Sequence, residues 1–379
     1  MMFTNKARMT TVLVICVLTM VFYIGVHQGR VSEYVKIALG YLDDDVNPPD
    51  VMTRNGTLFE RQPVQQIVTG IAKIDAEEET VHERSDVVGV GGTMIDLETA
   101  EPKELMNRMV IVTAISQNHL KESKGMIGSV QEFLPHTRII MYDLGLTPRG
   151  IKQVRRLCNV ELRTFDFSMY PSHVRNLLKF AWKPLIIQGA LNEFGIVFWC
   201  DASARFKRNP LVLFTLLKEQ HGFMRRVVQY KPDYMLIRTH PKMFEALGID
   251  RENFKKDGDY AMCIEANRLL FVNSALVRRN IIEPWVDCAL RPACIAPNGS
   301  VIRQFMAGPK LYTHRFDQAA LALIIYKNLR GVFKEQNDRS ELFQDVVKVA
   351  RSSEGYEKAK VCNQSLTVSD WLPIFPNDW

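Results

Sequence analysis

Histidine and cysteine are scarce in this sequence, and none of them has the spacing of a metal site. The 379 residues include eight histidines and seven cysteines, without a CxxC pair or a His/Cys cluster, so no pattern predicts a zinc centre. A strong excess of one charge is also missing, because the formal net charge is only +6. We therefore expect no nucleic acid among the partners. With 47% apolar residues the chain can bury a large core, in one large domain or two smaller ones.

One long stretch near the N-terminus lacks charge altogether. It runs from Met9 to Val26 and follows Lys6 and Arg8. At 1.5 Å per residue such a helix spans roughly 27 Å, enough for the thinner membranes of the secretory pathway. It is either a cleaved signal peptide or an uncleaved signal anchor, and the missing small-residue cleavage site favours the anchor. We expect residues 1–8 in the cytosol, a transmembrane anchor at 9–26, and the rest of the chain in the lumen.

Acceptor sequons and cysteines agree with a luminal location. Asn55, Asn298 and Asn363 each begin an N-glycosylation sequon. Six cysteines lie beyond the anchor and permit up to three disulfides. Cys288 and Cys294 are close enough to pair across a local turn, whereas Cys200, inside an apolar run, is expected to be a buried free thiol.

The region 27–107 lacks the pattern of a folded core. Residues 70–107 hold ten acidic residues against three lysines or arginines. Such a composition buries too little apolar surface to offset chain entropy, so it predicts a flexible luminal stem. The GVGG sequence at 89–92 is interpreted as linker, because no convincing strand precedes it.

Regular alternation of apolar runs begins at residue 108. Strands are predicted at 109–116, 137–145, 160–165 and 196–200, with helices around 126–133, 150–158 and 171–191 between them. This order predicts an α/β, Rossmann-like domain with a mostly parallel sheet flanked by helices. Ligands of such sheets bind beyond the carboxyl ends of the strands. Asp201 directly follows the fourth predicted strand and lies at that edge.

Several stretches resemble a known family. VTAISQNHL, IIMYDLGLTPRG, YPSHVRNLLKFAWKPLIIQGALNEFGIVFWCDASARF and HRFDQAAL are similar, in order and spacing, to a nematode-type glycosyltransferase-like family of unknown function. The similarity covers roughly residues 108–335. Together with the anchor and stem, it resembles type II Golgi membrane proteins of GT-A architecture. It implies a luminal GT-A-like catalytic domain at 108–379.

The resemblance implies a site for the diphosphate of a nucleotide-sugar donor. In GT-A enzymes the fourth strand ends in a D-x-D motif that holds Mn²⁺ or Mg²⁺, which matches Asp201 and, with a hydroxyl in place of the second carboxylate, Ser203. His314 is the late candidate for a metal-binding histidine, with packing as the alternative. Lys183 and Arg205 are candidate phosphate-binding cations that could replace a tightly bound metal.

Further donor contacts are implied at the ends of the first two strands. Thr113 and Ala114 match the segment that lines the nucleotide base, or they are ordinary core residues of the strand. Asp143 reaches the ribose or only caps the turn that follows the second strand.

The acceptor side is expected around a later helix. Asp317 stands at its predicted N-cap, a position where aspartate needs no catalytic role. The resemblance instead implies that Asp317 and Gln318 face the sugars, with Asp317 accepting the proton of the acceptor hydroxyl. Glu265 and Asn267 are possible acceptor contacts by their position alone.

The sequence thus predicts a glycosyltransferase of the Golgi or endoplasmic reticulum membrane. It would move a sugar from a nucleotide-sugar donor to a hydroxyl of a glycan, glycoprotein or glycolipid. The alternative is a catalytically inactive relative that binds glycans or acts as a scaffold, supported by the serine at position 203.

Overall fold

The computed structural model describes residues 94–229, 232–257, 262–302, 311–333 and 340–362. These residues belong to a compact unit spanning Asp86–Trp379, and a separate unit spans Met1–Ser85. The predicted anchor, most of the predicted stem, and the sequons at Asn55 and Asn363 lie outside the described residues. Within the described ranges, no helix has the length and apolar character needed to cross a membrane.

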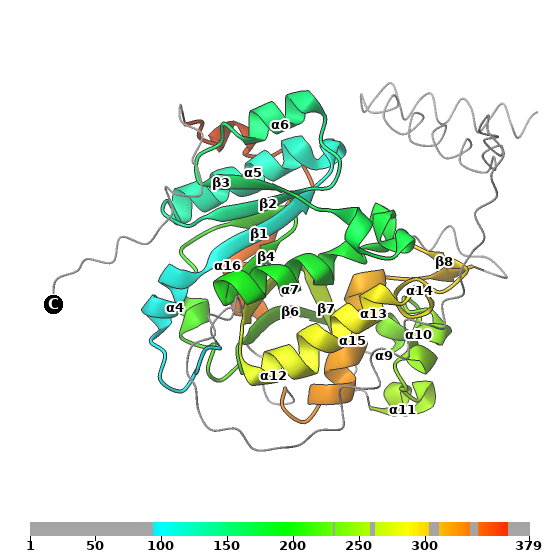
Figure 1. The fold of residues 1–379 in the computed structure, drawn as a ribbon. Coiled ribbons are helices and arrows are strands. Elements are labelled where there is room, and N and C mark those ends of the chain that lie inside the picture. Colours follow the sequence, from blue (N-terminus) through cyan, green and yellow to red (C-terminus); the bar gives the residue numbers. More distant parts are fainter. Residues whose placement is uncertain (1–93, 230–231, 258–261, 303–310, 334–339, 363–379) are drawn as a thin grey trace, which may run out of the picture. The chain divides into compact units, whose positions relative to one another are not determined.

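A six-stranded sheet organises the domain, in the order β3-β2-β1-β4-β7-β6 (Figure 1). Its parallel part consists of β1 (Val110–Ile115), β2 (Ile139–Asp143), β3 (Val160–Thr164) and β4 (Ile196–Cys200). The antiparallel part consists of β6 (Phe223–Gln229) and β7 (Cys263–Val272), with β7 hydrogen-bonded to β4. The predicted mixed α/β fold with a mostly parallel sheet is therefore confirmed.

Both faces of the sheet are covered, as the uninterrupted apolar strands require. In β1, Val110 and Val112 belong to one buried cluster, and Ile111 and Ile115 belong to another. Helices α7 (Trp182–Phe194) and α15 (Phe316–Leu329) supply the first cluster and lie in front of the sheet in Figure 1. Helix α5 (Leu120–Phe133) supplies the second cluster.

The remaining elements are short. The helices are α4 (Pro102–Arg108), α6 (Pro148–Val154), α8 (Leu211–Phe214), α9 (Pro232–Leu236), α10 (Pro241–Ala246), α11 (Arg251–Lys256), α12 (Ala275–Val277), α13 (Glu283–Leu290), α14 (Pro292–Ile295) and α16 (Ser340–Val346). Small strands are β5 (Ala204–Phe206), β8 (Ser300–Val301), β9 (Tyr312–Thr313) and β10 (Val347–Val349).

Two segments differ from the sequence prediction. The helix expected over 171–191 is broken: single 3₁₀ turns occupy Ser172–Arg175 and Leu177–Lys179, and α7 begins only at Trp182. The break falls at Phe180, whose φ of 51° is left-handed and interrupts a right-handed helix. Residues 94–107, which were assigned to the stem, pack on the domain through the buried Ile95 and Leu105.

Two disulfides tie distant and local parts of the chain. The predicted Cys288–Cys294 bond is present, and a second bond joins Cys158 to Cys362 across 204 residues. Cys200 is a buried free thiol, as expected. The C-terminal segment also pairs β10 antiparallel with β5.

Candidate functional site

Asp201 occupies the edge at which parallel sheets bind ligands. It follows β4 directly, and its backbone N–H donates to the Asn267 carbonyl on β7 at 2.8 Å. Its carbonyl accepts from the Ala204 N–H at 2.9 Å, which closes a tight turn. About a third of its side chain, 36%, is exposed. The carboxylate is therefore anchored by its backbone and open to solvent.

A buried lysine joins Asp201 to Asp317. Lys183 Nζ lies 3.2 Å from Asp201 Oδ1 and 2.8 Å from Asp317 Oδ2, and it donates to the Ala266 carbonyl at 3.2 Å. The side chains of Lys183 and Asp317 are only 4% and 7% exposed. We call these three residues the Lys183 cluster. The structure brings together three residues that the sequence analysis had selected one by one, from α7, β4 and α15.

The charges of the cluster depend on one another. Burial disfavours the ammonium form of Lys183, but the charges of Asp201 and Asp317 outweigh it and raise the pKa of Lys183. Burial raises the pKa of the Asp317 carboxyl, against the opposing attraction of Lys183. The two carboxylates therefore keep Lys183 protonated although burial disfavours its charge.

Aromatic rings surround the ammonium group. The rings of Phe180 and Trp199 have their centroids 5.6 and 5.5 Å from Lys183 Nζ, within the range of cation–π attraction. The Trp199 indole also donates to Asp201 Oδ1 at 2.8 Å. Sequence analysis missed Trp199, although an indole N–H in a buried strand needs an acceptor, and Asp201 lies two residues along on the same face.

Backbone strain occurs on two sides of the cluster. Phe180 and Phe316 have φ values of 51° and 37°, which cost energy in residues other than glycine. Helix α15 begins at Phe316 and its N-cap is Arg315. The prediction that Asp317 is the N-cap is therefore wrong. Asp317 lies in the first turn, where its carbonyl accepts from the Trp285 indole at 3.0 Å.

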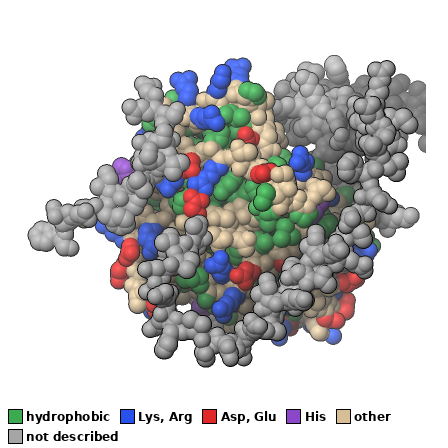
Figure 2. Space-filling model, in the orientation of Figure 1, with side chains coloured by type: hydrophobic (Ala, Val, Ile, Leu, Met, Phe, Trp, Pro, Cys, Tyr) green, Lys and Arg blue, Asp and Glu red, His purple; other side chains and the backbone are tan. Residues whose placement is uncertain are grey.

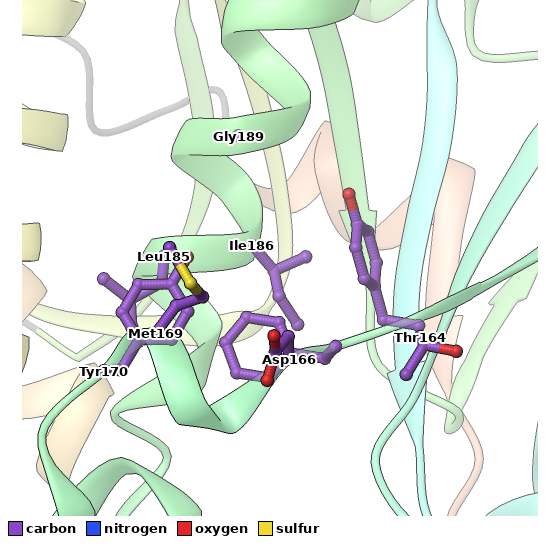
Figure 3. Close-up of a pocket in the computed structure, with 9 residues that line it drawn as sticks. Thr164, Asp166, Met169, Tyr170, Leu185, Ile186 and Gly189 are labelled. Atoms are coloured by element: carbon purple, nitrogen blue, oxygen red, sulfur yellow. The ribbon is translucent and has the colours of Figure 1, made fainter.

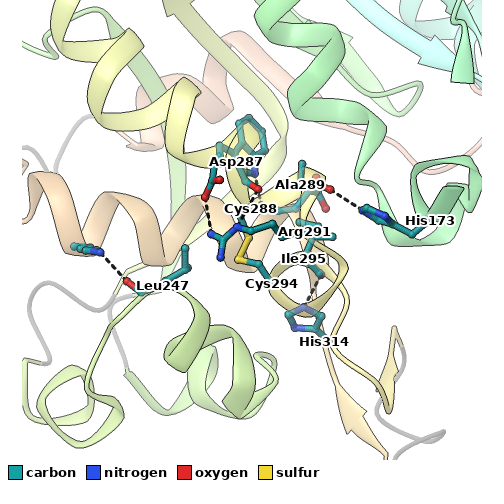
Figure 4. The surroundings of a disulfide bond; sticks show 12 residues. His173, Leu247, Asp287, Cys288, Ala289, Arg291, Cys294, Ile295 and His314 are labelled. Carbon is teal, nitrogen blue, oxygen red and sulfur yellow. Dashed lines mark hydrogen bonds and ion pairs between the residues drawn. A yellow bond between two sulfur atoms is a disulfide. The ribbon is translucent and has the colours of Figure 1, made fainter. Parts of the chain in front are cut away.

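A disulfide-stapled segment supports the start of α15 (Figure 4). The Cys288–Cys294 bond links α13 to α14, and the carbonyl of Ile295 accepts from His314 Nε2 at 3.0 Å. His173, before α7, contacts the Ala289 carbonyl at 2.8 Å. The staple therefore contacts segments that lead into both α7 and α15.

Arg205 has a different place from the one predicted for a donor-binding cation. It is 4% exposed, and all five of its N–H groups donate to backbone carbonyls at 2.8–3.1 Å. The acceptors are the carbonyls of Glu122, Ala202, Ala204, Ser352 and Glu354. With no donor group left, Arg205 holds the chain segments together and cannot bind a diphosphate in this arrangement.

The residues predicted to bind a metal do not form a matching set of ligands. His314 is fully buried, and its Nδ1 accepts from the His240 N–H at 3.1 Å while Nε2 contacts Ile295. Burial lowers the pKa of His314 to about 3. Ser203 is 7% exposed, and Lys183 already holds Asp201. Within the described ranges, no group of three His, Cys, Asp or Glu side chains could hold a metal ion.

The residues of β1 and β2 that were predicted to bind the donor are not part of the Lys183 cluster. Thr113 is fully buried in β1, and its hydroxyl has no hydrogen-bond partner. Ala114 is half-buried and pairs in register with Tyr142. Asp143 Oδ1 accepts from the N–H groups of Gly145 and Leu146 at 2.8 and 2.6 Å. Of the two interpretations of Asp143, the structure has the turn cap.

The predicted acceptor residues are held by protein partners. Glu265 accepts from Arg226 at 2.9 Å and also pairs with the buried Arg268. Asn267 Oδ1 accepts from Arg268 at 3.2 Å. Gln318 Nε2 contacts the Cys263 thiol at 3.5 Å. Gln318 and Asn267 adjoin the Lys183 cluster through their neighbours Asp317 and Ala266, whereas the Glu265 carboxylate is neutralised by the two arginines.

His119 is a nearby residue that sequence analysis did not select. It lies after β1, and its Nδ1 is 2.9 Å from Glu122. The hydrogen bond to Glu122 raises the pKa of His119, and the charges of Glu122 and Asp201 add to the effect. About half of its side chain is exposed. His119 thus adds a titratable group on the β1 side of Asp201.

A pocket of about 200 Å³ adjoins the same helix (Figure 3). Leu185, Ile186 and Gly189 of α7 line one side, and the rest of the lining comes from Tyr142, Thr164, Phe165, Asp166, Met169 and Tyr170. Phe165 and Tyr170 stack with ring centroids 5.2 Å apart. The pocket lies beyond the carboxyl ends of β2 and β3, so it belongs to the same edge of the sheet as Asp201.

Helix α6 and the residues just after it carry four basic side chains. Arg149, Lys152, Arg155 and Arg156 are exposed, and Figure 2 shows lysine and arginine side chains along the top of the molecule, where Figure 1 places α6. These four side chains form a solvated face.

Comparisons with known proteins give a family match over part of the chain. A family model described as a protein of unknown function (DUF1647) matches residues 61–188. No curated protein sequence matches the chain.

Several solved structures are similar at low identity. A galactosyltransferase, LgtC, in complex with donor and acceptor sugar analogs is 15% identical over 47% of this chain and 63% of its own length, with a TM-score of 0.32. Mouse xyloside xylosyltransferase 1 is 13% identical over 59% of this chain and 82% of that one, with a TM-score of 0.35. Core-mannan synthase A from Aspergillus fumigatus, in its Mn/GDP form, is 9% identical over 67% and 77%, with a TM-score of 0.36. Likeness this low assigns no residue role to this chain.

Proposed function

We propose that this chain is a glycosyltransferase that moves a sugar from a nucleotide-sugar donor to a hydroxyl of a glycan, glycoprotein or glycolipid. The observation that carries the proposal is the Lys183 cluster at the carboxyl edge of β4, where Asp201 is open to solvent and Lys183 Nζ lies 3.2 Å behind it. The order and spacing of the sequence blocks that resemble glycosyltransferases support it independently.

The proposed reaction needs a carboxylate and a nearby positive charge. The acceptor oxygen bonds to the anomeric carbon, and the bond from that carbon to the diphosphate breaks, leaving its electron pair on the nucleoside diphosphate. A carboxylate takes the acceptor proton. Asp201 is the better candidate, because it is 36% exposed and Asp317 only 7%. Lys183 and Asp317 then act as positioning residues that hold the Asp201 carboxylate, with the Trp199 indole as a further donor.

The proposed reaction does not rely on a tightly bound metal. A divalent cation would need several oxygen ligands around the diphosphate, and Asp201 is the only carboxylate of the predicted metal set. Lys183 lies between Asp201 and Asp317 and partly offsets their negative charge at the same edge.

A direct test uses release of nucleotide by the full-length chain from a panel of nucleotide sugars, with and without Mn²⁺. We expect release from one donor, at least 100-fold slower in Asp201→Asn. Asp287→Asn is the matched control, because Asp287 is exposed on α13 and pairs only with Arg291. Equal rates in Asp201→Asn and the wild type would contradict the proposed role of Asp201.

The alternative is an inactive relative that binds glycans. One observation favours it: each of the three Lys183 donors already has a protein partner. It predicts no nucleotide release from any donor and no binding of UDP or GDP by calorimetry in a folded protein.

We also propose, from the sequence alone, a single-pass type II location in the Golgi or endoplasmic reticulum membrane. Protease protection of the C-terminal part in intact vesicles tests that topology.

A further inference from the structure

Two arginines lie beside the Lys183 cluster. Arg238 follows α9, and Arg315 is the N-cap of α15, two residues before Asp317. Their backbones meet, because the Arg315 N–H donates to the Arg238 carbonyl at 3.0 Å. Among the described residues, neither guanidinium has a carboxylate partner, and Arg238 has a buried terminal nitrogen without an acceptor.

The lack of a carboxylate partner contrasts with the next charged group along the sheet. Arg226 and Arg268 both pair with Glu265, which offsets one of their two positive charges. Arg238 instead lies with its guanidinium carbon 3.6 Å from the centroid of the Tyr234 ring. A guanidinium stacked on a tyrosine keeps its edge of N–H groups available for a planar anion.

Both arginines lie close to a group that adjoins the cluster. The Cys263 thiol contacts Gln318, the residue after Asp317. Burial raises the pKa of Cys263 to about 11, and the charges of Arg238 and Arg315 act in the opposite direction. The two positive charges and the first turn of α15 therefore share one small region.

This region lies on the antiparallel side of Asp201. Cys263 begins β7 and pairs with Gln229 of β6, whereas β1, β2 and β3 lie on the opposite side of β4. The carboxyl ends of the parallel strands are the expected donor side. A group held by Arg238 and Arg315 would approach the cluster from the other side.

We propose that Arg238 and Arg315 bind a carboxylate or sulfate group on the sugar acceptor, so that the acceptor is an acidic glycan. This inference rests on the proposed function, because the bound glycan is an acceptor only if the chain transfers a sugar. Binding of the anionic glycan itself does not depend on catalysis. Arginine forms bidentate hydrogen bonds with carboxylates and similar oxyanions, and the 14-residue helix α15 directs its N-terminus to the same region.

The test measures dissociation constants of the full-length chain for three hexasaccharides: uncharged chitohexaose, O-sulfated chitohexaose and hyaluronan hexasaccharide, which carries carboxylates. We expect at least one of the two anionic sugars to bind at least tenfold more tightly than chitohexaose. The stronger of the two identifies the anion. Arg238→Gln and Arg315→Gln should each remove that difference, and Arg315→Lys should retain part of it.

The control is Arg149→Gln, which removes an exposed arginine from α6 and should leave the affinities unchanged. UDP and GDP binding is measured in parallel.

Equal affinity for all three sugars would overturn the inference. So would arginine variants that weaken nucleotide binding and leave glycan binding intact, because the arginines would then belong to the donor. If no donor is hydrolysed but glycan binding still depends on both arginines, the proposed transfer fails and the acidic-glycan site stands. Since Arg315 is half-buried, its variant remains informative even if Arg238→Gln does not fold.

Discussion

Lys183 and Arg205 are two buried cations near the end of β4, and the sequence suggested the same role for both. Their partners differ. Lys183 contacts two carboxylates, one of which is open to solvent, whereas Arg205 contacts five backbone carbonyls from three parts of the chain. A ligand can reach the first set through Asp201, but it cannot reach the second set. The partners of a buried cation, rather than its position along a motif, therefore decide whether it contributes to a binding site or only holds chain segments together.

Replacing Arg205 should have the largest effect on stability. Arg205→Leu leaves five carbonyls without their donors, and at about 1 kcal/mol for each net hydrogen bond we expect a loss of about 5 kcal/mol. Urea denaturation followed by circular dichroism measures it. A loss below about 1 kcal/mol would show that Arg205 does not hold these segments together.

A pair of glycines offers a second test of the same contact. A Cβ at Gly125 would lie 2.5 Å from the Arg205 guanidinium and 2.4 Å from the Glu354 carbonyl, whereas a Cβ at Gly189 meets no atom within 4 Å. Gly125→Ala should therefore destabilise the fold, and Gly189→Ala should be neutral or slightly stabilising because alanine favours helix. Equal effects of the two changes would contradict the close packing around Arg205.

Replacing Lys183 should have a smaller, pH-dependent effect. Lys183→Met leaves Asp317 buried without its cation, which costs about 3 kcal/mol at pH 7.5. The folded-state pKa of Asp317, already raised, should rise further above the unfolded value of about 3.9. The variant should therefore lose stability as the pH rises from the unfolded pKa of Asp317 to its folded-state pKa. At pH 4.5 the loss should be small.

Adding Asp317→Asn to Lys183→Met removes the unpaired charge and should restore most of the stability at pH 7.5. Denaturation curves of the two single variants and the double variant, at both pH values, measure this coupling. The same loss at pH 4.5 and pH 7.5 would mean that the ion pair does not carry the effect.

His314 should give the smallest effect. Its unfolded pKa is near 6.5 and its folded pKa about 3, so the unfolded state binds the proton first. The contribution of neutral His314 to the free energy of unfolding is complete above pH 6.5. It falls as the pH drops, by about 2 kcal/mol between pH 6.5 and 5. His314→Gln should reduce the slope of the free energy of unfolding against pH by the contribution of one proton. Some slope should remain, because burial also lowers the pKa of His240. An unchanged slope would contradict the buried neutral His314.

The parallel half of the fold and the edge position of Asp201 could be predicted because both depend on local pattern. The runs in β1 and β4 are continuously apolar, and strands buried on both faces require that. Asp201 follows such a run, so its position at the edge needed no tertiary information.

The contacts of the site could not be predicted, because they join distant residues. Lys183 and Asp317 are 134 positions apart, and no periodicity relates them. The break at Phe180 depends on a left-handed backbone that the surrounding rings hold in place. Arg205 and Ser352, whose carbonyl it binds, are 147 positions apart. Sequence therefore selected the three members of the Lys183 cluster but not their association.

The Cys158–Cys362 bond has a consequence for biosynthesis. A ribosome adds about 5–20 residues per second, so the 204 residues between these cysteines take roughly 10–40 seconds to emerge after Cys158. Cys294 follows Cys288 within about a second, so that bond can close while the chain is still growing. Cys158 therefore has no bonding partner until Cys362 has been made. A chain that stops before Cys362 would keep every strand of the main sheet and leave Cys158 without a disulfide partner.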